Sequence, residues 1–177
     1  MSLLFFPVNC MKRTVIPITL AAALGAFLSG CAALRNDYVE PASGPMARLT
    51  VVNASARSSR FDLFDDAAEC TGRRLAALLP RSSAEQPKPR QSIKIPATGP
   101  LSFSYLTGLP GDAGGRLECQ FTGTFTPRAN DDYMLEVRGE GRRCSLLFRG
   151  RDGRAVPVTE KRYRGGVTEA SSFCSAR

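Results

Sequence analysis

The stretch LSFSY, residues 101–105, alternates apolar and polar side chains without a break. In an extended strand, successive side chains point to opposite faces, so Leu101, Phe103 and Tyr105 share one side. Ser102 and Ser104 occupy the other. We therefore predict a strand with its apolar side against a core and its serine side facing water.

The same period of two recurs along the chain and decides the fold class. The further predicted strands are 47–52 (ARLTVV), 60–64 (RFDLF), 92–95 (SIKI), 117–125 (LECQFTGTF), 133–137 (YMLEV), 144–148 (CSLLF) and, more weakly, 155–159 (AVPVT). One stretch, 66–79, is rich in Ala, Leu and Arg and is expected to form at most one short helix. About eight short strands separated by polar turns predict an all-β, antiparallel β-sandwich of the immunoglobulin or transthyretin type.

The segments between the strands carry turn residues. GEG at 139–141 and RDG at 151–153 each predict a hairpin containing glycine, and the proline-rich stretch 80–91 predicts a surface loop. In FTPRANDDY, Tyr133 follows a polar corner and opens an apolar strand. That position suits a tyrosine corner, in which a buried ring returns its hydroxyl to the corner, although a plain strand-start aromatic fits the sequence equally well.

The N-terminal segment has the order of an export signal. Met11, Lys12 and Arg13 precede an uncharged, mostly apolar run that ends in LSGC at 28–31. The run is short for a spanning helix, which needs about 20 apolar residues. Residues 1–10 place apolar residues before the cations, so we expect translation to start at Met11. An ordinary secretory signal, with an incidental cysteine, is the other interpretation.

Leu28, Ser29, Gly30 and Cys31 resemble the lipobox of bacterial lipoproteins. The resemblance implies a signal peptide at 1–30, cleavage before Cys31 and acylation of the Cys31 thiol. Because no aspartate follows Cys31, it also implies lipid anchoring in the outer membrane, facing the periplasm. Residues 31–45 are then the lipidated cysteine and a flexible tether, and 46–177 a single β-sandwich domain. A lipobox, a short tether and an F-T-P…Y corner together resemble small bacterial lipoproteins with sandwich folds.

Four cysteines remain beyond Cys31, and an even number in an exported domain predicts disulfide bonds. We favour Cys70–Cys119 with Cys144–Cys174, because neighbours in sequence are often neighbours in space. The pairing Cys119–Cys144 with Cys70–Cys174 is the main alternative. The wide spacings, without a C-x-x-C pair, argue against a zinc site.

The 177 residues include no histidine, which removes the usual general base near neutral pH and the commonest nitrogen ligand of metals. No phosphate-binding glycine loop occurs either, so we predict no cofactor, no metal and no catalytic site. The formal net charge is +8. Arginines concentrate near the C-terminal strands, and we predict an anion-binding face there, formed by Arg142, Arg143, Arg149 and Arg151.

These observations favour a membrane-anchored periplasmic lipoprotein that acts as a binding, accessory or structural module of the cell envelope. Its expected partners are the membrane, through the lipid, and an anionic envelope glycan, lipid or protein. Nucleic acid is not expected, because no aromatic residues are interleaved with the arginines to stack bases. The alternative is an enzyme, or an enzyme inhibitor, directed at the cell wall.

Overall fold

A computed structural model describes residues 36–108, 119–140, 143–164 and 173–176. These residues contain ten strands and no helix. The strands are β1 (Met46–Asn53), β2 (Ser59–Asp66), β3 (Thr71–Leu79), β4 (Arg90–Pro96), β5 (Leu101–Thr107), β6 (Gln120–Phe125), β7 (Asp132–Glu140), β8 (Arg143–Gly150), β9 (Thr159–Tyr163) and β10 (Cys174–Ala176).

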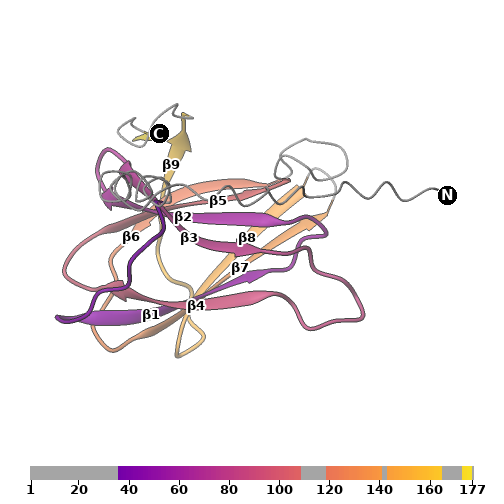
Figure 1. The fold of residues 1–177 in the computed structure, drawn as a ribbon, viewed down its shortest axis with the longest axis horizontal. Helices are drawn as coiled ribbons and strands as arrows, with labels where there is room; N and C mark the ends of the chain where they lie inside the picture. Colours follow the sequence, from indigo (N-terminus) through magenta and orange to yellow (C-terminus); the bar gives the residue numbers. More distant parts are fainter. Residues whose placement is uncertain (1–35, 109–118, 141–142, 165–172, 177) are drawn as a thin grey trace, which may run out of the picture. The chain divides into compact units, whose positions relative to one another are not determined.

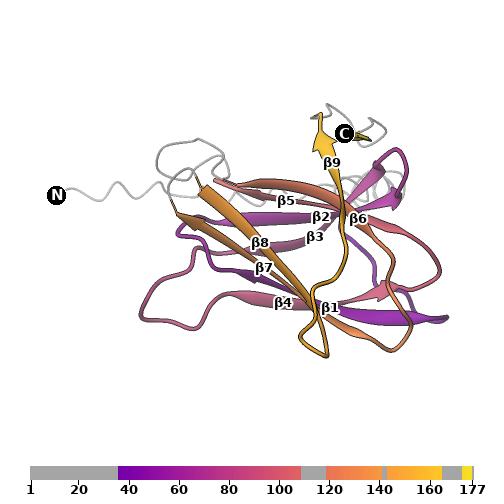
Figure 2. The ribbon, with the colours of Figure 1, turned by 180° about the vertical axis from the view of Figure 1, so that it is seen from behind.

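The strands form two sheets (Figures 1 and 2). One has the order β4-β1-β7-β8 and the other the order β10-β9-β6-β5-β2-β3. All neighbouring strands are antiparallel except β1 and β7, which run parallel. The hairpins β2–β3, β5–β6 and β7–β8 join strands that are consecutive in sequence. The predicted all-β sandwich is therefore confirmed.

The core lies between the sheets and takes its side chains from the apolar faces of both. Leu49, Val51 and Leu135 come from the four-stranded sheet and are fully buried. Phe103 comes from the six-stranded sheet, and its ring lies 6.1 Å from that of Phe148 on β8. Edge-to-face aromatic contacts of this kind add to the gain from burying apolar area.

No helix forms within 66–79, which agrees with the expectation of at most one short helix, but the strand found there was not predicted. The structure has a turn at 67–70, followed by β3, which pairs with β2 across a bulge at Phe61 and Asp62. Cys70 and Gly72 have positive φ angles of 51° and 66°, which a helix does not accommodate. Pairing with β2 thus overrides the helical propensity of the Ala, Leu and Arg residues.

Seven of the eight predicted strands are found, with boundaries shifted by a few residues, and 155–159 is the exception. That stretch makes an isolated bridge at Ala155, and β9 begins only at Thr159. The short strand β10 was not predicted. The RDG turn reverses the chain as expected, since the Gly153 amide donates to the Gly150 carbonyl and Arg149 pairs with Ala155.

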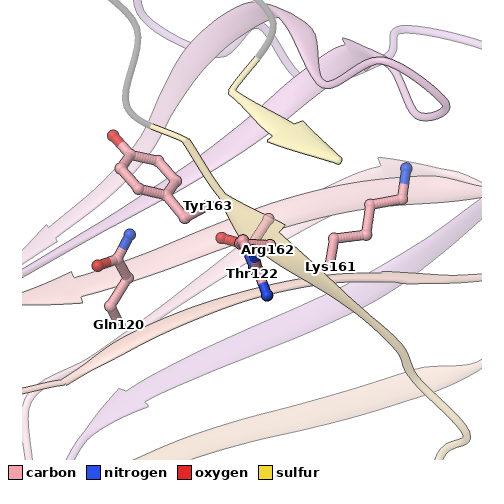
Figure 3. A pocket seen from close by; sticks show the side chains of 5 residues that line it. All are labelled: Gln120, Thr122, Lys161, Arg162 and Tyr163. Atoms are coloured by element: carbon pink, nitrogen blue, oxygen red, sulfur yellow. The ribbon is translucent and has the colours of Figure 1, made fainter. Parts of the chain in front are cut away.

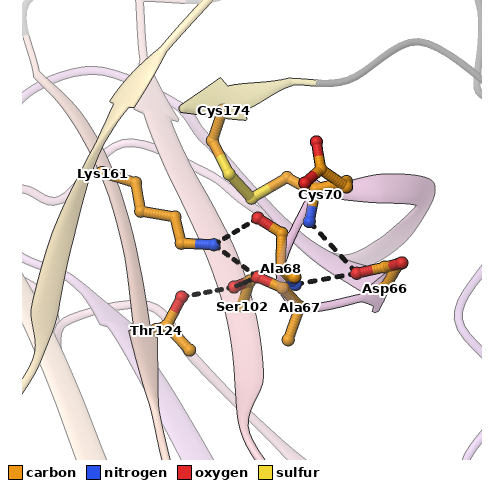
Figure 4. Close-up of a disulfide and its surroundings, with 9 residues drawn as sticks. Asp66, Ala67, Ala68, Cys70, Ser102, Thr124, Lys161 and Cys174 are labelled. Atoms are coloured by element: carbon orange, nitrogen blue, oxygen red, sulfur yellow. Dashed lines mark hydrogen bonds between the residues drawn. A yellow bond between two sulfur atoms is a disulfide. The ribbon is translucent and has the colours of Figure 1, made fainter. Parts of the chain in front are cut away.

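The serines of β5 do not face water, contrary to prediction. β5 lies inside the six-stranded sheet, and Ser102 and Ser104 are both fully buried. The turn after β2 lies over this face, where the Ser102 hydroxyl donates to the Ala67 carbonyl at 2.6 Å (Figure 4). Lys161 of β9 also donates to this turn, through hydrogen bonds to the carbonyls of Ala67 and Ala68.

The favoured disulfide pairing is also wrong. The structure pairs Cys70 with Cys174 (Figure 4) and Cys119 with Cys144, which is the alternative connectivity. Both bonds join Cα atoms 5.5 Å apart. Cys119 and Cys144 are the closest pair in sequence, 25 residues apart, whereas the fold brings Cys70 and Cys174 together across 104 residues.

Local contacts explain this pairing. The Phe173 amide donates to the Cys70 carbonyl at 3.1 Å, which places Cys174 beside the turn that contains Cys70. Phe64 and Phe173 pack on this disulfide in a small second core, and the Arg73 guanidinium lies 4.2 Å from the centre of the Phe173 ring.

Tyr133 forms the corner that its position suggested. Its ring is buried in the core, and its hydroxyl accepts a hydrogen bond from the Arg128 amide at 2.8 Å. The hydroxyl itself donates to the Asp131 carboxylate. This arrangement fixes the connection between β6 and β7, and so the parallel alignment of β7 beside β1.

Residues 36–40 lie within the stretch predicted as a flexible tether, but they are bonded to the domain. The Leu75 amide of β3 donates to the Asn36 carbonyl, and the Tyr38 amide donates to the Leu75 carbonyl. The Tyr38 hydroxyl donates to the Lys94 carbonyl of β4 at 2.8 Å, and Glu40 accepts from the Lys94 amide. We call residues 36–40 the strap, because they connect the edge strands of the two sheets.

Candidate functional site: a basic sheet face

Of the predicted anion-binding residues, Arg149 and Arg151 are described with their side chains, and both are exposed at the end of β8. Arg143 begins β8, but only its backbone is described. Arg142 lies outside the described residues, as does the predicted lipidation site Cys31. The predicted cluster is therefore only partly placed.

Arg149 belongs to a wider surface on the outer side of the four-stranded sheet. The pairing register aligns Lys94, Arg48 and Asp132 in one row across β4, β1 and β7. The next row is Ser92, Thr50, Met134 and Arg149, and the one after it contains Arg90, Val52, Glu136 and Leu147. We call these three rows the basic face, together with the flanking residues Lys88, Arg138 and Arg151.

Some of its cations are paired with carboxylates. Asp132 contacts Arg151 and lies 3.8 Å from Arg48. Glu136 accepts from Lys88 at 2.7 Å and from Arg138 at 2.8 Å. Burial raises the pKa of Glu136, but the hydrogen bonds and the positive charges of Lys88 and Arg138 together outweigh it and leave the pKa below its usual value.

Three other cations make no ion pair with any described residue: Arg90, Lys94 and Arg149. All three are exposed. Between them lie the hydroxyls of Thr50 and Ser92, which are 2.8 Å apart, and the exposed side chain of Met134. Seven cations against two carboxylates on one sheet face give a positive potential that attracts anions.

Sequence reasoning missed most of this face, because its cations come from four separate strands. Arg48, Arg90 and Lys94 each stand alone in sequence among polar or apolar neighbours. The available signal was the period of two, which assigns these residues to the solvent side of their strands. It could not show that the strands were neighbours in one sheet.

A pocket of about 320 Å³ lies on the other sheet, between β6 and β9 (Figure 3). It is lined by Gln120, Thr122, Lys161, Arg162 and Tyr163, with no carboxylate among them. The Thr122 hydroxyl is buried and has no hydrogen-bond partner within the described ranges. Lys161 is held by the carbonyls of the turn after β2. These side chains do not form an acid–base pair.

The acidic side chains near β2 act within the structure. Asp62 is buried, and the single N–H of the Arg60 Nε is shared between its two carboxylate oxygens, each 2.8 Å from that nitrogen. Burial raises the pKa of Asp62, and the neighbouring arginines oppose this effect. Asp66 caps the turn by accepting from the amides of Ala68 and Glu69, and these bonds lower its pKa. Among the residues placed by the structure, no group of three potential metal ligands occurs.

Neither a scan of protein-family models nor a search of curated proteins found a match to this chain. No helix in the described part of the chain is long and apolar enough to cross a membrane. Inferences about function therefore rest on the residues themselves.

Proposed function

We propose that this protein is a lipid-anchored module of the bacterial outer membrane, faces the periplasm, and binds an anionic component of the envelope through its basic face. The observation that carries the binding proposal is a group of three exposed cations on one sheet face, none with an ion pair among the described residues: Arg90, Lys94 and Arg149. Such a surface suits an extended anionic partner better than a small substrate held in a pocket.

Two further observations support export and anchoring. The LSGC motif at 28–31 offers Cys31 for acylation, and several acyl chains hold a protein on a bilayer far better than one. Both disulfides suit an oxidising compartment such as the periplasm. Replacing Cys31 with Ser is expected to move the protein from the membrane fraction to the soluble periplasmic fraction, or to leave an uncleaved precursor. Mature protein that stays on the membrane at an unchanged level would contradict the anchor.

The binding proposal is tested with dextran sulfate as an anionic polymer and with protein extracted from membranes in neutral detergent. The face variant carries Arg90→Gln, Lys94→Gln and Arg149→Gln. The control variant carries Arg81→Gln, Arg162→Gln and Arg164→Gln. The control removes the same charge from exposed arginines outside the basic face.

We expect the face variant to bind dextran sulfate at least tenfold more weakly at 0.1 M salt, and the control variant to bind within about threefold of the wild type. Raising the salt concentration should weaken wild-type binding, because screening shortens the range of surface charges. Equal losses in the two variants would show that binding follows net charge alone. That result would contradict a specific role for the basic face.

A further inference from the structure

We propose that the partner of the basic face is the anionic headgroup layer of the same membrane that holds the lipid anchor, so that the domain lies on the bilayer. This inference rests on the proposed acylation of Cys31. It adds an orientation: the four-stranded sheet faces the lipid, and the six-stranded sheet faces away. Two independent features support it, namely the short connection to the anchor and the charge of the surface beside that connection.

The connection is short because the strap begins at Asn36. The Asn36 carbonyl accepts from the Leu75 amide at 2.7 Å, and its side-chain carbonyl accepts from Arg74. Only five residue steps separate Asn36 from Cys31. An extended chain covers at most about 3.5 Å per residue, so Asn36 stays within roughly 18 Å of the acylated Cys31. The domain therefore cannot move far from the headgroups.

The strap also reaches the edge of the basic face. It runs along the edge of β4, where Tyr38 and Glu40 bind the backbone of Lys94. Half-burial raises the pKa of Tyr38 to about 12, so its hydroxyl remains a donor to Lys94 at physiological pH. Lys94 is one of the cations of the basic face that make no ion pair with a described residue, and its side chain is exposed. The strap thus leads from β3, where Asn36 is held, to β4, the edge strand of the basic face.

The surface itself suits a headgroup layer. Arg90, Lys94 and Arg149 are exposed and have no ion-pair partner in the described ranges. Each cation near an anionic surface contributes roughly a fivefold gain in partitioning. Met134, which is 39% exposed between them, offers an apolar side chain to the interface. Tethering makes this docking intramolecular, so weak contacts suffice to hold the domain down.

Met134 gives a direct readout of docking. We suggest reconstituting the acylated protein, as extracted from membranes, into vesicles of phosphatidylcholine alone or with 30% phosphatidylglycerol. Dilute hydrogen peroxide then converts exposed methionine to the sulfoxide, which is quantified by peptide mass spectrometry. Flotation of the same samples reports the anchor separately.

We expect Met134 to be oxidised at least fivefold more slowly on anionic vesicles than on neutral ones. The protection should disappear at 0.5 M NaCl and in the Arg90→Gln, Lys94→Gln, Arg149→Gln variant. It should persist in the control variant with changes at Arg81, Arg162 and Arg164.

The outcomes separate the two proposals. Protein that does not float with neutral vesicles contradicts the anchor, and with it the proposed function. Protein that floats while Met134 oxidises at equal rates on both vesicles overturns the docking inference and leaves the anchor intact. Protection by dextran sulfate but not by phosphatidylglycerol would identify an anionic polymer as the partner and would likewise overturn the inference.

Discussion

Removing the two disulfides separately should destabilise the domain by different amounts. One double variant carries Cys70→Ala and Cys174→Ala, and the other carries Cys119→Ala and Cys144→Ala. The first bond closes a sequence separation of 104 residues and the second a separation of 25. In the chain-entropy model, these loops contribute about 4.7 and about 3.5 kcal/mol to the free energy of unfolding. We therefore expect the first variant to be less stable than the second by about 1 kcal/mol.

The comparison is internally matched, because each variant replaces two cysteines with alanine. Cys70, Cys119 and Cys174 are buried to a similar extent, and Cys144 is half-buried. Losses from packing therefore cancel in large part. The chain has no tryptophan, so unfolding in urea is best followed by far-UV circular dichroism and extrapolated linearly to zero denaturant.

Two results would refute this reasoning. If loss of the Cys119–Cys144 bond destabilised the protein more than loss of the Cys70–Cys174 bond, loop length would not control the effect. If non-reducing peptide mapping of the wild type recovered Cys70 linked to Cys119, the connectivity itself would be wrong.

Three further variants test particular contacts. Tyr38→Phe removes the hydrogen bond to the Lys94 carbonyl, which contributes about 1 kcal/mol, and should speed hydrogen exchange of the amides bonded to the strap. Unchanged exchange would mean that packing of the ring alone holds the strap in place. Glu136→Gln should cost about 0.5 kcal/mol at pH 7. Because the folded-state pKa of Glu136 is lowered, the difference from the wild type in urea melts should disappear as the pH falls through that pKa, and a constant difference would contradict the ion pairs. Phe103→Ala should cost about 3–5 kcal/mol in thermal or urea melts, and a loss below 1 kcal/mol would contradict its place in the core.

The period-two pattern predicted most strands because burial of one face leaves a trace in the sequence. The sequence of β3 does not show this alternation. Its first half is half-buried at a sheet edge, and its pattern is broken by a bulge opposite Phe61 and Asp62. The serines of β5 were assigned to solvent because alternation reveals two faces, but it does not reveal that a turn from elsewhere in the chain covers the second one.

The candidate site was predicted only in part for a similar reason. Arg149 and Arg151 stood out because arginines are dense in their segment. Arg48, Arg90 and Lys94 gained significance only when the order β4-β1-β7-β8 placed them side by side. The parallel pairing of β1 with β7 joins residues more than 80 positions apart, and no local pattern encodes it. The disulfide pairing depended on the same long-range topology.

The mass of the intact mature protein, extracted from membranes without reduction, tests the central claim most directly. The account predicts a chain that begins at Cys31, carries two or three acyl chains, and is lighter by four hydrogens for its two disulfides. A mature chain that begins at another residue, or that begins at Cys31 without any acyl group, would contradict it.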